Sequence, residues 1–441
     1  MAWAEVEMAG VDLGDRRLNC RLVKLLERLS EQPSASIPDA CGGWAETKAA
    51  YRLLSHDKID WSDILEPHWA RTQERMRAES VVLCLQDTTE LDFNGQAIEG
   101  LGPLSYEAQR GMYLHATLAI SLQRVPLGVL DAWMWARGAK GEDGRRPPAL
   151  KESVRWVEGY ERVAEQAQAL PGVRLVYVAD REGDMLTLMA RAATLGHPAD
   201  WLLRSQHDRK LNAEGERLWT QVNQEAACGD IAFDLPARRG QKARQVRQSV
   251  RIKRVELPLA GGATLEVSAV VAREVDPPKG VKPLEWRLLT NRKVMDLEAA
   301  AELIDWYRAR WEIEIFFHTL KTGCQVESLQ LSSMARLERA LAVYLVVSWR
   351  IGLLMRLGRA CPDGDAERLL TREEWQAAWI LARKPVPKQV PSLRAALHMI
   401  ARQGGFLGRK SDGEPGVKSL WLGLQQIASC VAGMRFQQSC G

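Results

Sequence analysis

Two aspartates in this chain stand where their side chains could take part in phosphoryl chemistry. Asp87 follows the apolar run VVLCLQ (81–86), and Asp180 follows a second apolar run, VRLVYVA (173–179). Both runs are typical of short strands that are buried on both faces of a sheet. A carboxylate at the carboxyl end of such a strand lies at the sheet edge where open α/β folds bind their ligands. We therefore expect Asp87 and Asp180 to follow neighbouring strands of a central sheet.

A third acidic residue, Glu314, belongs to the segment 305–323, which contains no Pro and reaches its first Gly at Gly323. This pattern predicts one helix. At about 100° per residue, one narrow polar stripe on it contains Tyr307, Arg310, Glu314, His318 and Lys321. A second polar stripe, roughly opposite, contains Asp305, Arg308, Glu312 and Thr319. A single carboxylate among cationic side chains suits a metal and a phosphate together. The alternative is a solvated helix with charge pairs at i,i+4 spacing.

Taken together, the three carboxylates indicate a metal site. Converging acidic groups repel one another unless a cation lies between them. Oxygen ligands without Cys or His favour Mg²⁺ or Mn²⁺. Two such ions ~4 Å apart can activate an attacking water and stabilise the leaving oxygen of a phosphodiester. The structural alternatives are that Asp87 caps a turn or helix and that Asp180 forms a surface ion pair with Arg181.

Composition places the chain among ordinary globular proteins. Its 441 residues are enough for two or three domains, and a net charge of +4 does not by itself identify a nucleic-acid binder. Eight scattered cysteines without a C-x-x-C pair favour reduced thiols in the cytoplasm over a zinc site or disulfides. We expect no signal peptide and no apolar run near the ~20 residues of a membrane span.

The order of predicted elements indicates an α/β protein in three parts. Residues 1–75 read as a small helical domain with helices at 15–29 and 44–54, of a kind that docks in the DNA major groove or forms a solvated cap. Residues 76–325 alternate strands and helices and contain a basic, all-β insertion at 207–285. Residues 326–441 read as helical, with helices at 333–359, 371–381, 392–402 and 420–432.

These motifs resemble those of a known family. Tyr307, Arg310, Glu314 and Lys321 match the Y-x₂-R-x₃-E-x₆-K signature of cut-and-paste bacterial insertion-sequence transposases, the insertion sequence four family of the DDE class. Asp87-Thr88-Thr89 and Asp180-Arg181-Glu182-x-Asp184 are similar to its two Asp motifs. The resemblance covers roughly 10–205 and 285–325 and implies an RNase H-like mixed sheet flanked by helices.

The resemblance also implies residue roles. Asp87, Asp180 and Glu314 would be the catalytic metal ligands, with Mg²⁺ or Mn²⁺, two ions in all, as the cofactor. Phosphate and base contacts near the scissile bond would come from Tyr307, Arg310, Lys321, His318, Arg181, Arg204 and Trp286, the last stacking on an extruded base. Terminal inverted repeats would be recognised through Arg16, Arg17, Arg21 and Arg52. His318 stands where many members carry Lys, which would make that phosphate contact weaker or pH-dependent.

In such a protein the partners would be transposon-end DNA, target DNA and a second copy of the chain, with no membrane. Excision would pass through a hairpin end before the 3′ ends are joined to target DNA. We expect the protein in the bacterial cytoplasm, associated with the nucleoid. Two other functions fit the same residues: an RNase H-like nuclease without strand transfer, and a DNA-binding regulator whose catalytic domain is silent.

Overall fold

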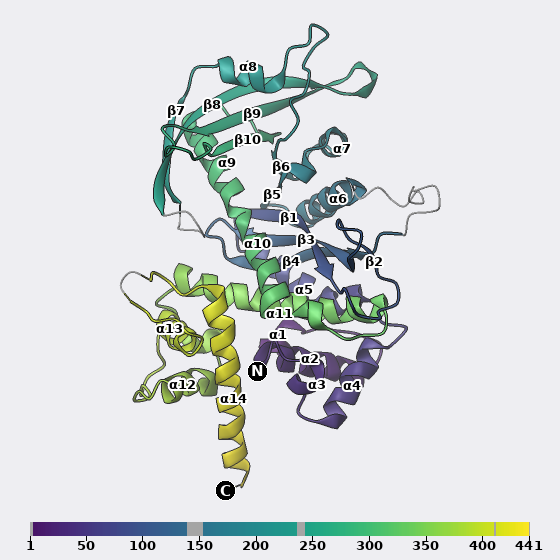
Figure 1. Cartoon of the computed structure of the whole chain (residues 1–441), viewed down its shortest axis with the longest axis vertical. Coiled ribbons are helices and arrows are strands. Elements are labelled where there is room, and N and C mark those ends of the chain that lie inside the picture. The colour runs from purple at the N-terminus through teal and green to yellow at the C-terminus, as the bar shows by residue number, and fades with distance from the viewer. Residues whose placement is uncertain (1–2, 139–152, 236–242, 410–411, 441) are drawn as a thin grey trace. The chain divides into compact units, whose positions relative to one another are not determined.

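The computed structural model describes residues 3–138, 153–235, 243–409 and 412–440 (Figure 1). The chain divides into two units. Unit 1 comprises Met1–Ala78, Thr88–Ala149 and Glu312–Gly441, and unit 2 comprises Glu79–Asp87 and Leu150–Trp311. Strand β1 (Val81–Asp92) therefore contributes its first residues to unit 2 and its last residues to unit 1. The three-part division at 75/76 and 325/326 remains a prediction.

The N-terminal part of unit 1 is helical, as the sequence predicts. Its helices are α1 (Trp3–Glu7), α2 (Arg16–Glu31), α3 (Ile37–Ala40), α4 (Trp44–Leu54) and α5 (Trp61–Met76). Helix α2 begins at Asp15, whose side chain accepts a hydrogen bond from the Arg17 N–H. The inner face of α2 is a buried leucine stripe at helical spacing: Leu18, Leu22, Leu25, Leu26 and Leu29.

A buried charged cluster ties α1 to α5 inside unit 1. Glu7 accepts hydrogen bonds from Arg75 at 2.9 and 3.0 Å, and its carboxylate lies 2.5 Å from His68 Nδ1. His68 Nε2 accepts the Val129 N–H, so the Nδ1 proton points at Glu7. Burial alone would raise the pKa of Glu7, but His68 and Arg75 together lower it from 4.5 to about 2. The ionised form of Glu7 is therefore part of the folded state.

The remainder of unit 1 combines strands and C-terminal helices. Strand β3 (Arg110–Ser121) pairs antiparallel with β2 (Gly102–Pro103) and β4 (Pro126–Trp135). The helical elements are α10 (Trp311–His318), the π-helical turn η3 (Thr319–Gly323), the 3-10 turn η4 (Val326–Ser328), α11 (Met334–Ala360), the 3-10 turn η5 (Ala366–Arg368), α12 (Arg372–Leu381), α13 (Leu393–Gln403) and α14 (Val417–Cys440).

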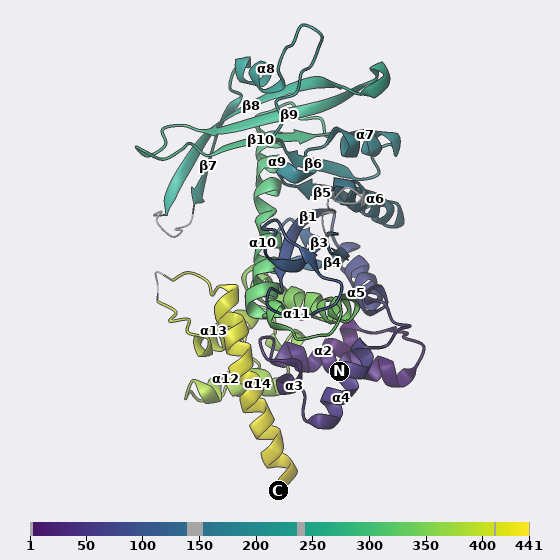
Figure 2. The same cartoon turned by 45° about the vertical axis from the view of Figure 1, so that its right-hand side comes forward.

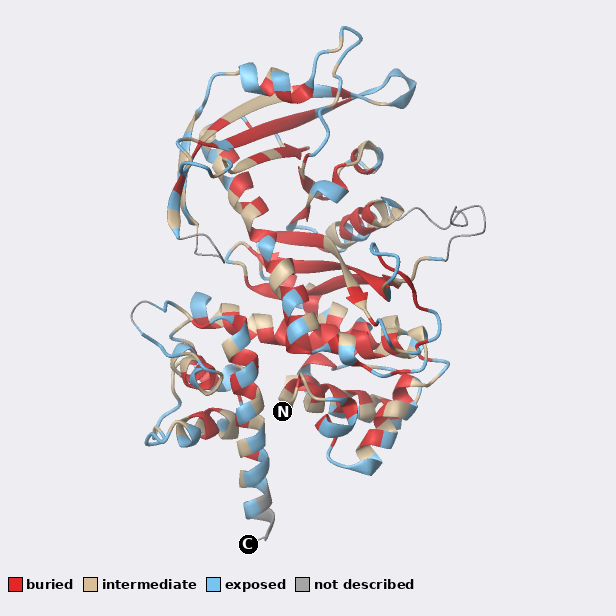
Figure 3. Cartoon of the chain, in the orientation of Figure 1, coloured by how far each residue is buried: buried red, intermediate tan, exposed pale blue. Residues whose placement is uncertain are grey.

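Helix α11 is the core helix of unit 1. It packs against α2, α5, α13 and β4. Most residues in the middle of the helix are buried (Figure 3). By length and composition it is apolar enough to cross a membrane, contrary to the expectation that no segment would be. However, 78% of its most apolar window is buried inside the protein, as in the core helix of a globular protein.

Unit 2 is built on a sheet with the strand order β1-β5-β6-β10-β9-β8-β7. Strands β1, β5 (Arg174–Ala179) and β6 (Asp200–Arg204) are parallel, whereas β10 (Glu285–Thr290), β9 (Thr264–Glu274), β8 (Arg244–Pro258) and β7 (Gly229–Leu235) pair antiparallel. The helical elements are α6 (Ser153–Ala169), the 3-10 turn η1 (Arg181–Gly183), α7 (Leu186–Thr194), α8 (Leu218–Gln224), the 3-10 turn η2 (Ala260–Gly262) and α9 (Leu297–Ala309). Helix α8 packs against the long hairpin β8–β9 (Figure 2).

The predicted fold class is confirmed: a mixed α/β protein with a mixed sheet, flanking helices, N-terminal helices and a C-terminal helical region. In chain order, β1, β3, β4, α6, β5, α7 and β6 follow the succession of an RNase H-like domain. In its described residues the segment 207–285 carries the strands β7, β8 and β9, but it is not all-β as predicted, because α8 lies within it.

Two predicted boundaries are wrong. Strand β1 does not end at residue 86 but continues to Asp92. The helix predicted at 305–323 begins earlier, at Leu297, and is interrupted at Arg310 between α9 and α10. It ends in the π-helical turn η3 rather than in a regular α-helical turn.

Candidate active site

The pairing of β1 with β5 brings Asp87 and Asp180 together in unit 2. These parallel strands are in register from Val81↔Arg174 to Gln86↔Ala179, so Asp87 and Asp180 are the next residues on each strand. Because side chains alternate between the two faces of a sheet, both aspartates are expected on the same face. The sequence prediction that their strands are neighbours is confirmed.

The pKa of a buried tyrosine, Tyr177, is affected by both carboxylates. Burial, followed by the negative charges of Asp180 and Asp87, raises the pKa of Tyr177 well above its ordinary value of 10. The Tyr177 hydroxyl donates to the side chain of Gln86, the residue before Asp87, so it links β5 to β1. The pairing of the two strands beside the aspartates is thus fixed by side chains as well as by the backbone.

Asp180 also caps the turn that follows β5. Its Oδ1 accepts the Glu182 N–H at 2.8 Å and begins η1. The surface ion pair with Arg181 that the sequence left open does not form within the described part of the chain, and Arg181 is exposed. Asp180 therefore combines a structural role at the turn with a place beside Asp87.

Arg310 contacts Asp87 directly. Its Nη1 donates to Asp87 Oδ2 at 2.6 Å, and the side chains of Arg310 and Asp87 are only 10% and 13% exposed. Arg310 was predicted as a phosphate ligand. In this structure its guanidinium lies on a carboxylate that was predicted to bind metal. A charge-assisted hydrogen bond with so little solvent is among the stronger contacts in a protein.

An aromatic and cationic group surrounds α9 in unit 2. The Trp286 ring packs edge-on against Tyr307, with centroids 6.3 Å apart, and stacks on Phe233 at 5.5 Å. The Arg204 guanidinium lies 5.9 Å from the Tyr307 ring. Trp286 is only 9% exposed. Phe233, a residue that the sequence analysis did not identify, covers one face of its ring. No simple sequence motif marks Phe233, because its partner lies more than fifty residues away on another strand.

In unit 1, Glu314 and Lys321 occupy the last turns before Gly323. Glu314 is half-buried on α10. Lys321 Nζ donates to the Glu90 carbonyl at 2.7 Å and lies 3.1 Å from the Glu327 carboxylate, which anchors η3 to β1. His318 is exposed, and its ring lies 5.5 Å from Trp421 on α14.

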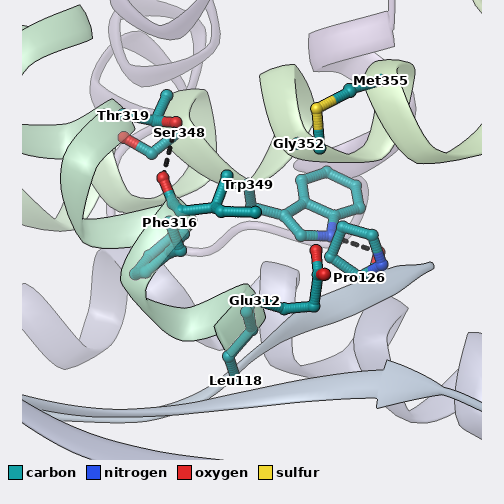
Figure 4. A pocket seen from close by; sticks show the side chains of 10 residues that line it. Leu118, Pro126, Glu312, Phe316, Thr319, Ser348, Trp349, Gly352 and Met355 are labelled. Atoms are coloured by element: carbon teal, nitrogen blue, oxygen red, sulfur yellow. Dashed lines mark hydrogen bonds between the residues drawn. The ribbon is translucent and has the colours of Figure 1, made fainter. Parts of the chain in front are cut away.

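Glu312, a member of the second polar stripe, is not solvated. Glu312 is buried, and Arg356 Nε of α11 donates to its carboxylate at 2.7 Å. Burial raises the pKa of Glu312, while the charge of Arg356 opposes that shift. Figure 4 shows Glu312 at the side of a small pocket lined mainly by apolar groups such as Leu118 and Trp349. The burial of Glu312 is therefore explained by its ion pair with Arg356 within unit 1.

The four arginines predicted to recognise DNA ends lie on α2 and α4. Arg16, Arg17 and Arg52 are exposed, and Arg21 is half-buried. Arg17 pairs with Asp15 at 2.8 Å. The two helices are joined by Glu46, which accepts hydrogen bonds from Arg28 and lies 2.7 Å from Lys24 Nζ.

Unit 2 thus offers two hard-oxygen ligands, Asp87 and Asp180, at adjacent strand positions. Both donors suit Mg²⁺ or Mn²⁺. Among the described residues, no three His, Cys, Asp or Glu side chains are grouped so that they alone could hold a metal ion. The third proposed ligand, Glu314, belongs to unit 1. The chemistry of Asp87 and Asp180 therefore fits a hard divalent cation, as proposed ligands within unit 2.

Three family models of transposases match this chain. "Transposase DNA-binding" matches residues 1–59, "Transposase DDE domain" matches 196–349, and "Transposase Tn5 dimerisation domain" matches 346–441. The DDE match includes Glu314 and begins beyond Asp87 and Asp180. Together the matches support a DDE transposase with a DNA-binding and a dimerisation domain, an enzyme class that generally uses divalent metal ions.

Among solved structures, the chain is similar to that described as "Cryo-EM structure of piggyBac transposase synaptic complex with hairpin DNA (SNHP)". The identity is 8%, the TM-score is 0.39, and the alignment covers 98% of this chain and 77% of that one. A likeness of this degree adds nothing on DNA or chemistry.

Proposed function

We propose, from the premise that the chain carries DNA-binding, DDE and dimerisation domains of transposases, that it excises and inserts a mobile DNA element. It binds terminal inverted repeats, cuts the element free by metal-dependent phosphodiester hydrolysis, and joins the 3′ ends to target DNA. The observation that carries this proposal is the register of β1 and β5, which aligns Asp87 with Asp180. Two carboxylates at adjacent positions of paired strands are ligands of the kind that such chemistry uses.

In this mechanism Asp87, Asp180 and Glu314 hold two Mg²⁺ or Mn²⁺ ions. When bound, these ions supply an activated nucleophile and stabilise the leaving oxygen. The chain's own contribution is positioning. Arg310, Tyr307 and Lys321 bind phosphates beside the scissile bond. Because Arg310 lies on Asp87 in this structure, it has to exchange that carboxylate for a phosphate when DNA binds.

The other predicted contacts belong to the same proposal. Arg16, Arg17, Arg21 and Arg52 recognise the inverted repeats, while His318, Arg181 and Arg204 contact the DNA backbone near the cut. Trp286 stacks on an extruded base when a hairpin end forms. Two copies of the chain pair through the C-terminal region. The protein acts on the bacterial nucleoid as a member of the insertion sequence four family.

The test is Asp180→Asn in the full chain, with Asp200→Asn, at the start of the neighbouring parallel strand β6, as the matched control. We expect Asp180→Asn to bind end DNA like the wild type in a gel shift and to lose cleavage and strand transfer in Mg²⁺. Asp200→Asn should keep all three. Cleavage retained by Asp180→Asn would remove Asp180 from the mechanism.

Two further functions are separated by their products. Pre-cut ends supplied with a supercoiled target give joined DNA with a transposase and none with an RNase H-like nuclease. A catalytically silent DNA-binding regulator would shift end DNA in a gel but cut it with no divalent ion.

A further inference from the structure

Asp184 is a buried carboxylate at the end of the short turn that begins at Asp180. The turn η1 closes when the Asp184 N–H donates to the Arg181 carbonyl at 3.2 Å. Asp184 is 1% exposed, and its side chain is completely buried. A buried carboxylate is tolerated only where hydrogen-bond donors and a positive charge surround it. The segment that supplies these donors is therefore the one that Asp184 holds in place.

Within the part of the chain that the structure describes, the donors to the Asp184 side chain all come from one segment, Ser205–Arg209. Its Oδ2 accepts the Ser205 hydroxyl at 2.9 Å, the Gln206 N–H at 2.8 Å and the His207 N–H at 3.0 Å. Its Oδ1 lies 2.7 Å from Arg209 Nη1, a charge contact whose angle is not that of a hydrogen bond. Both oxygens of one carboxylate are thus engaged by a segment about twenty residues further along the chain.

The same segment also grips the backbone of the turn. Arg209 Nη2 donates to the Asp184 carbonyl at 2.8 Å, and Gln206 Nε2 donates to the Arg181 carbonyl at 2.8 Å. Arg209 is only 10% exposed in its side chain, so this arginine, in a basic stretch of sequence, is committed to the turn rather than to solvent. We call these contacts of Asp184 with Ser205–Arg209 the Asp184 clamp.

The Asp184 clamp joins the two segments that follow Asp180 and Arg204, two residues of the candidate site. The parallel pairing of β5 with β6 ends at Ala179↔Leu203, so Asp180 and Arg204 are the next residues on their strands. The turn held by the clamp starts at Asp180, and the segment that holds it starts after Arg204. Movement of the turn would therefore move Asp180 relative to Arg204.

We propose that Asp184 is a positioning residue that fixes Asp180 for metal binding and sets its place beside Arg204. The inference rests on the proposed function, because it assigns Asp184 to the same metal site. Groups that orient metal ligands from behind typically change metal affinity by about 10–100-fold when they are removed. In Asp184→Asn the amide would present a donor to Arg209, so the turn would lose its fixed place.

The experiment measures Mn²⁺ binding to the full chain without DNA, from the electron paramagnetic resonance signal of free Mn²⁺, together with thermal melting. We expect Asp184→Asn to bind Mn²⁺ roughly 10–100-fold more weakly than the wild type. Ser205→Ala, which removes one donor, should weaken Mn²⁺ by a smaller factor. Asp200→Asn, a carboxylate at the start of β6, should bind like the wild type even if its melting temperature falls.

Wild-type Mn²⁺ affinity in a folded Asp184→Asn protein would overturn the inference. If that variant does not melt cooperatively, Ser205→Ala decides, and unchanged affinity there would overturn it as well. Asp180→Asn separates the two proposals. If Asp180→Asn binds Mn²⁺ like the wild type, the proposed metal site itself is refuted and the clamp with it. If Asp180→Asn loses Mn²⁺ and both clamp variants keep it, only the clamp is refuted.

Discussion

Replacing Arg310 by alanine tests whether this arginine and a metal ion compete for Asp87. The guanidinium donates to Asp87 Oδ2 at 2.6 Å, and both side chains are largely shielded from solvent. An ion that takes this oxygen has to displace the guanidinium and then remain beside a second positive charge. We therefore expect Arg310→Ala to bind Mn²⁺ more tightly than the wild type in the absence of DNA, and to bind end DNA more weakly.

The size of the effect follows from the contact. A hydrogen bond to a charged group contributes about 1.5–3 kcal/mol. Because the Asp87 and Arg310 side chains keep 13% and 10% of their exposure, solvent screens part of this, and the lower end of the range applies. At about 1.4 kcal/mol for each factor of ten, the Mn²⁺ dissociation constant should fall roughly tenfold.

The assay titrates Mn²⁺ into wild-type, Arg310→Ala and Arg308→Ala proteins and records the free ion by electron paramagnetic resonance. Arg308→Ala is the matched control, because it removes a cation from α9 that pairs with Asp305 at 3.4 Å and covers the Phe233 ring. A gel shift of end DNA in a metal chelator measures the second effect. Equal or weaker Mn²⁺ binding by a folded Arg310→Ala protein would show that the arginine and the ion do not compete, and the reasoning would be wrong.

Three other outcomes are expected. The pKa of Glu7 falls from 4.5 in the unfolded chain to about 2 in the fold, so its contribution of about 3 kcal/mol is complete above pH 4.5 and is lost as the pH drops toward 2. Urea melts of Glu7→Gln should therefore show lower stability at neutral pH and a flatter acid limb than the wild type, and parallel curves would contradict this. A Cβ at position 159 would lie 1.5 Å from Gln86 Nε2, so Gly159→Ala should lower stability by about 1–3 kcal/mol in the same melts; an unchanged midpoint would mean that Gln86 moves freely. Because Phe233 covers one face of Trp286, Phe233→Ala should increase 2-aminopurine fluorescence at an extruded end base if the base takes that face, and Trp286→Ala should reduce it; no change in either variant would remove Trp286 from hairpin formation.

The placement of Asp87 and Asp180 on neighbouring strands was predictable, because the burial of both strands and their order along the chain can be read from the sequence. Two mainly apolar runs, each followed by Asp, indicate neighbouring parallel strands, and β1 and β5 pair in parallel, with Gln86 opposite Ala179. The extension of β1 beyond Asp87 was not predictable from polarity. The sequence prediction ended this strand at residue 86, yet the Phe93 N–H donates to the carbonyl of Arg110, the first residue of β3, and threonine is a good strand former.

Contacts made by residues distant in sequence escaped the prediction for a different reason. Periodicity on 305–323 groups Arg310 with other polar residues, but it says nothing of a carboxylate more than two hundred positions earlier. The same holds for Arg209. Its place in a basic segment suggested a basic surface, whereas in the fold Arg209 pairs with the buried Asp184. The sign of a charge can be predicted from sequence, but its partner requires the fold.

Glu312 and Glu314 show how far helical spacing can distinguish a structural carboxylate from a candidate metal ligand. They lie two residues apart, so they belong to different faces of α10, and the sequence assigned them to different stripes. Within unit 1, Glu312 is buried against Arg356 of α11, whereas Glu314 stays half-buried. Breaking a buried pair of this kind costs about 3–5 kcal/mol, because the remaining charge is left without a partner. A buried carboxylate that is already paired with an arginine is a poor metal ligand. Of the two acidic residues on α10, Glu312 is therefore the one whose ion pair with Arg356 makes it unsuited to bind a metal ion.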